Sequence, residues 1–241
     1  ILRGKVVPNT VTKTLHTDKV YEPELDSYAI EAFPYYSPLE SQIKTIRSFD
    51  RPVILVDDLV HKADRLQALA PSLKKAGIPV KKVVVGVISG YGRDLMETFH
   101  LPVESIYSMP NLRQWFVEST LYPFIGGDTV RRRDMKVAGL QPSVNMILPY
   151  AAPRLSGCSR EALYEFSVCC IENSRDLLQV LETEYRSQFA RNLTLSRLSE
   201  AVILPLCPDK GSCMEYDENL AASGYLENDL EMLGRMKKFM V

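Results

Sequence analysis

The sequence has 241 residues, of which 46% are hydrophobic and 24% are charged, and its formal net charge is −1. These values are typical of a globular protein of one or two domains that buries a full core, and they exclude a disordered chain. A charge near zero, without a block of five like charges, gives no long-range attraction to nucleic acid or to an anionic membrane, so we expect neither as a partner.

The first part of the chain predicts a loop-rich lead-in, a helix and a strand. Residues 5–22 alternate short β-prone pieces with polar and proline breaks, which favours a hairpin or loops. Over residues 38–47, apolar side chains recur at the spacing of one helical face, behind a proline suited to the first helical position. The continuous apolar run Val53–Val56 then predicts a central strand, buried on both faces of a parallel sheet.

Strands and helices are predicted to alternate after this strand. Leu66, Leu69 and Leu73 place a helix over residues 64–76, which ends at Gly77 and which Pro71 is expected to kink or restart. The following predictions are a strand over residues 83–88, a helix over 93–99 and a strand over 105–107. This alternation is typical of βαβ units with a parallel sheet.

The pattern changes after Pro149. Residues 159–189 carry a long amphipathic helical pattern, and residues 194–204 and 226–239 predict two further helices. We therefore expect an α/β domain over residues 1–149, with an open and mainly parallel sheet, and a helical region over 150–241 that packs on it.

The five cysteines lie in the last third of the chain and lack a paired C-x-x-C spacing. They predict neither a zinc site nor a disulfide framework, and reduced thiols suit the cytoplasm, where we expect the protein. No apolar run approaches the ~20 residues that a membrane-spanning helix needs. A chain that starts at Ile1 is compatible with a piece of a longer protein, and a second copy or neighbouring domains are the protein partners we consider.

Asp57 and Asp58 follow the first predicted strand directly and are the strongest candidates for a ligand site. In an open parallel sheet, ligands bind beyond the carboxyl ends of the strands. Two adjacent carboxylates at such a place risk costly burial, since neighbouring strand residues point to opposite faces. Ribose hydroxyls or a hydrated Mg²⁺ ion would give these acids a function.

The run from Val53 to Leu66 resembles the phosphoribosyl pyrophosphate-binding motif of type I phosphoribosyltransferases. It has the same order of four apolar residues, two acids, two apolar residues and a phosphate loop. The resemblance covers the chain to about residue 125 and not the helical remainder. It implies the open, mainly parallel sheet of that family, phosphoribosyl pyrophosphate or a nucleotide as ligand, Mg²⁺ as cofactor, and transfer of the phosphoribosyl group to a base-like acceptor.

The resemblance also assigns roles to individual residues. Asp57 and Asp58 would hold the ribose hydroxyls and contact the metal. The phosphate loop would consist of His61, Lys62, Ala63, Asp64 and Arg65. Family members have small hydroxyl residues around a glycine in this loop. Here Ala63 can replace that glycine only with a negative φ, Asp64 adds a charge that repels phosphate, and Lys62 and Arg65 are the cations that would compensate.

Two further segments are candidates. In the family, a mobile basic loop upstream of the motif closes over the donor, and Lys13, His16 and Lys19 occupy that place in chain order as catalytic candidates. The alternative is a surface hairpin with incidental lysines. Gly90 and Tyr91 lie in a glycine-rich turn between a predicted strand and helix, where Tyr91 would stack on an aromatic acceptor or simply be an exposed tyrosine.

Three functions remain open from the sequence. The first is an enzyme that transfers a phosphoribosyl group. The second is a non-catalytic module that senses a nucleotide or a sugar phosphate, or acts as a scaffold, and the altered phosphate loop favours it. A receiver domain, with the two acids as metal ligands, is the weakest, because the third predicted strand does not end in an aspartate that could accept a phosphoryl group.

Overall fold

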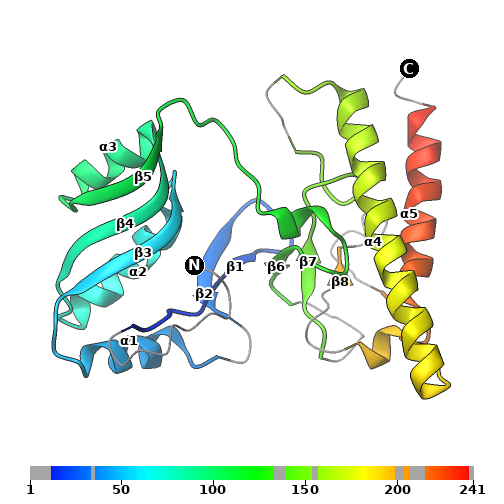
Figure 1. The fold of residues 1–241 in the computed structure, drawn as a ribbon, viewed down its shortest axis with the longest axis horizontal. Helices are drawn as coiled ribbons and strands as arrows, with labels where there is room; N and C mark the ends of the chain where they lie inside the picture. Colours follow the sequence, from blue (N-terminus) through cyan, green and yellow to red (C-terminus); the bar gives the residue numbers. More distant parts are fainter. Residues whose placement is uncertain are drawn as a thin grey trace. The chain divides into compact units, whose positions relative to one another are not determined.

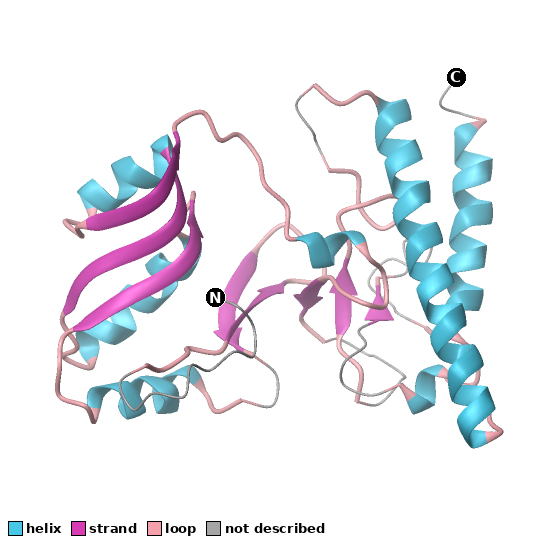
Figure 2. Ribbon diagram, in the orientation of Figure 1, coloured by secondary structure: helices cyan, strands magenta, loops and turns pink. Residues whose placement is uncertain are grey.

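The computed structural model describes residues 12–33, 36–132, 139–153, 157–198, 204–206 and 215–238. The protein is α/β, with a parallel three-stranded sheet, a mixed five-stranded sheet and helices (Figures 1 and 2). Its contacts divide the chain into two compact units, one of residues 1–19 and 29–115 and the other of residues 20–28 and 116–241. The domain boundary expected after residue 149 stays a prediction.

The three-stranded sheet follows the alternation that the sequence predicts. Its strands are β3 (Val53–Val60), β4 (Val80–Ser89) and β5 (Val103–Met109), which pair in that order and are all parallel. Helix α2 (Asp64–Lys75) connects the first two strands, and α3 (Gly90–Thr98) connects the second pair. Two βαβ units therefore build this sheet, as expected from the apolar runs.

One face of this sheet is covered by helices. Leu66 and Leu69 of α2 and Met96 of α3 belong to apolar clusters that include the odd-numbered residues of β3 and β4, such as Leu55 and Val85. The opposite face carries Ile54, Val56 and Ile106, which are exposed at 50%, 62% and 75% of their surface. The open face is thus exposed along most of the strands, whereas Val60 and Ile88, near the carboxyl ends of β3 and β4, are buried on that face as well.

Two expectations for β3 are corrected here. It is an edge strand of the described sheet, and β4 is the central one. It is also not buried on both faces, because its burial alternates along the strand and leaves Ile54 and Val56 exposed. A short apolar run has the same composition in an edge strand and in a central strand, so its position depends on pairing that the run itself does not encode.

The helices of this unit agree largely with their sequence patterns. Helix α1 (Leu39–Arg47) follows Pro38, and α2 continues through Pro71 without a restart. Gly77 adopts φ +67° just after α2, as expected of a residue that ends a helix. Helix α3 begins at Gly90, three residues earlier than expected, because the buried Ser89 side chain accepts the backbone N–H of Gly92 and caps the helix.

The five-stranded sheet combines strands from distant parts of the chain. Its order is β2 (Tyr28–Ala32), β1 (Thr17–Tyr21), β6 (Asp128–Val130), β7 (Pro142–Val144) and β8 (Leu204–Pro205). The β1–β6 and β7–β8 pairs are parallel, whereas β6 and β7 are antiparallel. The lead-in predicted over residues 5–22 thus contains strand β1, and its first residues lie outside the described part of the chain.

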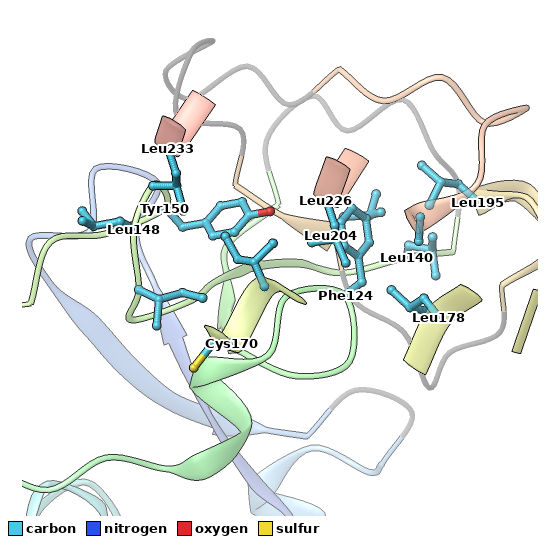
Figure 3. Close-up of a cluster of buried hydrophobic side chains, with 13 residues drawn as sticks. Phe124, Leu140, Leu148, Tyr150, Cys170, Leu178, Leu195, Leu204, Leu226 and Leu233 are labelled. Atoms are coloured by element: carbon cyan, nitrogen blue, oxygen red, sulfur yellow. The ribbon is translucent and has the colours of Figure 1, made fainter. Parts of the chain in front are cut away.

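The second unit is built on two long helices. Helices α4 (Arg160–Phe189) and α5 (Ala222–Lys237) confirm two of the predicted helices, and their buried side chains form a core with Phe124, Leu195 and Leu204 (Figure 3). The helix expected over 194–204 is wrong. A short 3₁₀ turn, Leu195–Arg197, and strand β8 occupy its described parts, and residues 199–203 are not described.

The second unit also contains a 3₁₀ turn, Glu118–Leu121, before β6.

None of the helices in the described ranges combines the length and the apolar composition that crossing a bilayer requires.

Candidate functional site

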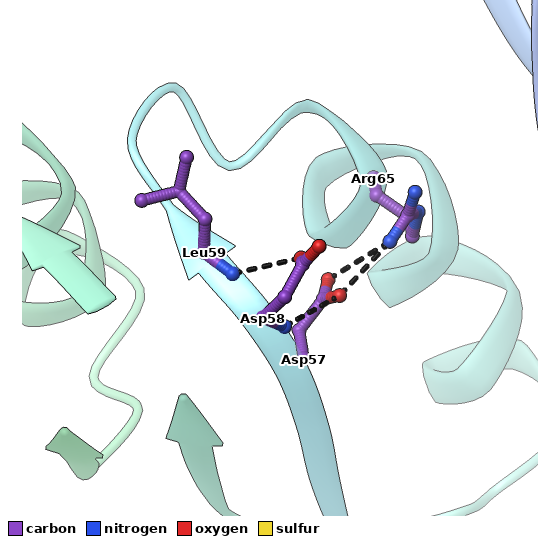
Figure 4. Close-up of polar contacts among 4 residues, drawn as sticks. All are labelled: Asp57, Asp58, Leu59 and Arg65. Carbon is purple, nitrogen blue, oxygen red and sulfur yellow. Dashed lines mark hydrogen bonds and ion pairs between the residues drawn. The ribbon is translucent and has the colours of Figure 1, made fainter. Parts of the chain in front are cut away.

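Asp57 and Asp58 lie in the carboxyl-terminal half of β3, three and two residues, respectively, before its end at Val60. Neighbouring residues of a strand alternate between its faces, but the two carboxyl groups lie close enough to hydrogen bond to each other (Figure 4). Asp57 lies on the face that α2 covers, and its side chain is 22% exposed. Asp58 lies on the open face and is exposed. The parallel strand and the position near its carboxyl end agree with the expectation from the sequence.

Arg65 is the charged partner of Asp57 (Figure 4). Its Nη1 atom lies 2.9 Å from Oδ1 and 3.2 Å from Oδ2 of Asp57, so one guanidinium nitrogen contacts both carboxylate oxygens. Asp57 Oδ1 also accepts the backbone N–H of Asp58, and Asp58 Oδ1 accepts the N–H of Leu59. The acid pair is therefore held by the first turn of α2 and by its own strand.

The surroundings shift the two carboxyl groups in opposite directions. Burial raises the pKa of Asp57; the Arg65 charge opposes this shift, and the neighbouring Asp58 adds to it. Burial alone would also raise the pKa of Asp58, but the hydrogen bond with the Asp57 side chain lowers it, with further contributions that include the Leu59 N–H and the Arg65 charge. Asp57 is therefore the first of the pair to take up a proton as the pH falls.

The turn from β3 into α2 occupies three residues, 61–63. Ala63 adopts φ 55° and ψ 25°, the left-handed conformation, directly before the helix begins at Asp64. The condition set for an alanine in place of the family's glycine, a negative φ, is therefore not met at Ala63. Alanine pays ~1–2 kcal/mol in this conformation, which glycine would not.

The other residues of the turn differ in their surroundings. Lys62 is exposed, and its carbonyl oxygen accepts a hydrogen bond from the Gln67 side chain. Asp64 is exposed in the first turn of α2, where a carboxylate interacts favourably with the helix dipole. The sequence therefore places the cation Lys62 and the anion Asp64 on either side of the left-handed Ala63.

His61 contacts a residue that we did not assign from the sequence. Its Nδ1 atom lies 2.8 Å from the hydroxyl oxygen of Ser89, which is 1% exposed. Ser89 Oγ also accepts the backbone N–H of Gly92, so this one hydroxyl joins the turn after β3 to the first turn of α3. The signal in the sequence was a serine at a strand–helix junction, a favoured helix cap.

Gly90 and Tyr91 stand beside this pair. The Tyr91 ring meets the His61 ring edge to face, with centroids 6.1 Å apart, and 57% of Tyr91 is exposed. A Cβ atom at Gly90 would lie 2.7 Å from the carbonyl oxygen of Pro110, so only glycine fits there. The structure thus brings residues 61–65 and the start of α3 together where β3 and β4 have their carboxyl ends. We call this place the carboxyl edge of β3 and β4.

Lys13, His16 and Lys19 contact other parts of the chain. The Lys13 ammonium lies 5.8 Å from the centroid of the Phe49 ring, and the His16 ring stacks on Tyr36 at 3.8 Å. Lys19 belongs to strand β1. Their catalytic assignment stays a prediction.

A divalent cation fits the acid pair poorly. Mg²⁺ demands near-octahedral oxygen ligands, whereas both oxygens of Asp57 already contact Arg65. The described residues contain no group of three or more histidine, cysteine, aspartate or glutamate side chains that could hold a metal ion.

No family model matches the chain. A comparison with curated proteins finds no relative either. The resemblance to type I phosphoribosyltransferases therefore depends on the residues themselves, chiefly the run from Val53 to Leu66.

Proposed function

We propose that the chain binds a phosphorylated ribose compound, either phosphoribosyl pyrophosphate or a nucleotide, at the carboxyl edge of β3 and β4. The observation that carries the proposal is the link from strand to helix: an acid pair near the end of a parallel strand, then a three-residue turn with a left-handed residue, then a helix N-terminus. This is the local arrangement that the resemblance to type I phosphoribosyltransferases implies. It combines acceptors for hydroxyl groups with donors for an anion.

Each part of this edge has a role in the proposal. Asp58, exposed on the open face, accepts ribose hydroxyls, and Asp57 assists it. The phosphate lies at the N-terminus of α2, where backbone N–H groups point outward and the dipole favours an anion. Lys62 adds a charged donor beside the turn, and the His61 ring adds nitrogen atoms that can form hydrogen bonds.

Transfer of the phosphoribosyl group is the activity that the resemblance implies. The bond from the ribose carbon to pyrophosphate breaks, a bond to a nitrogen of the acceptor forms, and pyrophosphate leaves. Such a reaction needs positioning and stabilisation of the leaving group more than a protein nucleophile. Tyr91 is then the surface on which an aromatic acceptor stacks.

A sensing or scaffold module without catalysis is the second candidate. Ala63 stands at the left-handed position of the turn, and one acid is engaged by Arg65, both departures from the family motif. These departures change the side chains available to a donor substrate. The helix N-terminus after the turn remains suitable for binding a phosphate group.

Calorimetric titration with phosphoribosyl pyrophosphate tests the binding proposal. We expect the double variant Asp57→Asn, Asp58→Asn to lose binding, because amides replace the charged acceptors of the ribose hydroxyls. Lys62→Ala should weaken binding by about 1–3 kcal/mol, the scale of a charge-assisted hydrogen bond. Lys75→Ala, at the other end of α2, is the matched control and should bind as the unchanged protein does.

The results separate the alternatives. Binding that survives in the double variant would place the ligand elsewhere. Absence of binding of both phosphoribosyl pyrophosphate and a nucleoside monophosphate at millimolar concentration would refute the proposed function, since that concentration reveals interactions of ~4 kcal/mol. Binding without release of pyrophosphate in the presence of purine and pyrimidine bases would favour the sensing module over the transferase.

A further inference from the structure

Asp57, one of the two adjacent acids of β3, forms an ion pair with an arginine of the same chain. Two neighbouring carboxylates, one of them 22% exposed, need positive charge nearby to remain ionised. Arg65 supplies it from the first turn of α2, with one nitrogen at 2.9 and 3.2 Å from the two oxygens of Asp57. The short turn after β3 fixes this contact, because the helix starts only one residue before Arg65.

The guanidinium group keeps unused donors. Both contacts to Asp57 involve Nη1, and neither Nη2 nor Nε of Arg65 makes a hydrogen bond within the described ranges of the chain. The Arg65 side chain is 44% exposed, so these N–H groups are accessible to a ligand. Arginine binds phosphate oxygens through such a planar set of donors, whereas magnesium would have to displace the guanidinium from Asp57 to reach the acid.

We propose that Arg65 takes the place of the divalent cation at this site, joining Asp57 to a phosphate group of the ligand, so that the ligand binds without a metal ion. This inference rests on the proposed binding of a phosphorylated ribose compound. In this proposal, the positive charge beside Asp57 comes from Arg65 and not from a metal ion.

Titration with Mn²⁺ alone tests the acid pair without any organic ligand. Free Mn²⁺ is followed by its electron paramagnetic resonance signal. The unchanged protein should not bind the ion at this site below about 1 mM, whereas Arg65→Gln should bind it at least about tenfold more tightly, because the guanidinium group no longer occupies the two oxygens of Asp57. Arg93→Gln, which removes an arginine that contacts Ser108 rather than an acid, is the matched control.

A second variant tests whether the added Mn²⁺ binds at the acid pair or at another place in the protein. Adding Asp57→Asn to Arg65→Gln should abolish the gain in Mn²⁺ affinity, and circular dichroism checks that each variant is folded. Equal Mn²⁺ affinity of the unchanged protein and Arg65→Gln would overturn the inference.

Titration with phosphoribosyl pyrophosphate, in EDTA and in excess Mg²⁺, tests the ligand. We expect the affinity of the unchanged protein to agree within about threefold between the two conditions. In EDTA, Arg65→Gln should bind about tenfold or more weakly, the scale of a charge-assisted hydrogen bond, and Mg²⁺ should restore part of the loss. Binding by the unchanged protein that requires Mg²⁺ would overturn the inference and leave the proposed function standing. Absence of binding in both conditions, for phosphoribosyl pyrophosphate and for a nucleoside monophosphate, would refute the function and the inference with it.

Discussion

At the scale of single residues, the adjacent thiols Cys169 and Cys170 show how a helix gives neighbours opposite environments. Cys169 is exposed on α4, whereas Cys170 is 4% exposed in the core of the second unit. Burial, with a smaller contribution from Cys169, raises the pKa of Cys170 to about 11. The thiolate is the reactive form, so the two residues should differ strongly in reactivity.

We expect iodoacetamide at pH 8 to modify Cys169 in the folded protein and to leave Cys170 unmodified. At that pH the Cys170 thiolate is only about a thousandth of the total, because each pKa unit is a factor of ten. Mass spectrometry of the peptide checks the result. In Cys169→Ser the same peptide should remain unmodified until urea unfolds the protein, and modification of that variant in the folded state would contradict the prediction.

At the scale of elements, the connection from β3 to α2 decides where the candidate site forms. A strand and a helix that follow each other within three residues place the acid pair, Lys62 and Arg65 around one turn. The same connection requires a left-handed residue, which is Ala63.

Ala63→Gly tests the strain in this turn. Glycine should remove ~1–2 kcal/mol of left-handed strain, and it loses roughly as much through a buried methyl group and chain entropy, so we expect a stability within about 1 kcal/mol of the unchanged protein. Ala68→Gly, at an exposed position inside α2, should instead destabilise by about 1 kcal/mol. Urea unfolding compares the two. A larger loss from Ala63→Gly than from Ala68→Gly would show that the turn carries no strain.

At the scale of the whole molecule, the two compact units have separate apolar cores. Among the described residues, the core between α4, α5 and the short strands shares none with the clusters that α2 and α3 form on the three-stranded sheet. Leu233 is fully buried in the former and Leu73 is 1% exposed in the latter. A substitution that removes packing in one core should therefore promote local unfolding in that unit before it affects the other.

Hydrogen exchange tests this separation. Leu233→Ala should cost about 2–5 kcal/mol and accelerate exchange in α4 and α5, with little change in β3, β4 and β5. Leu73→Ala should produce the reverse pattern. Faster exchange throughout the chain in both variants would instead indicate a single cooperative unit.

The sequence by itself determined the alternating strands and helices of the parallel sheet in the first unit. Apolar runs and helical spacing predicted β3, α2, β4, α3 and β5 in the right order, because these patterns depend on residues close together in the chain. The position of the acids near the end of a parallel strand followed from the same local signals. The long amphipathic pattern of α4 was equally visible.

The tertiary structure alone decided which residues meet. Strands β6, β7 and β8 have only two or three residues each, too few to show a period, and they form by pairing with partners distant in sequence. The edge position of β3 likewise depends on pairing. Arg65 reaches Asp57, and Ser89 reaches His61, because a left-handed turn and parallel strand register bring them together. Local patterns specify elements, whereas contacts between elements depend on long-range packing and set the chemistry of the site.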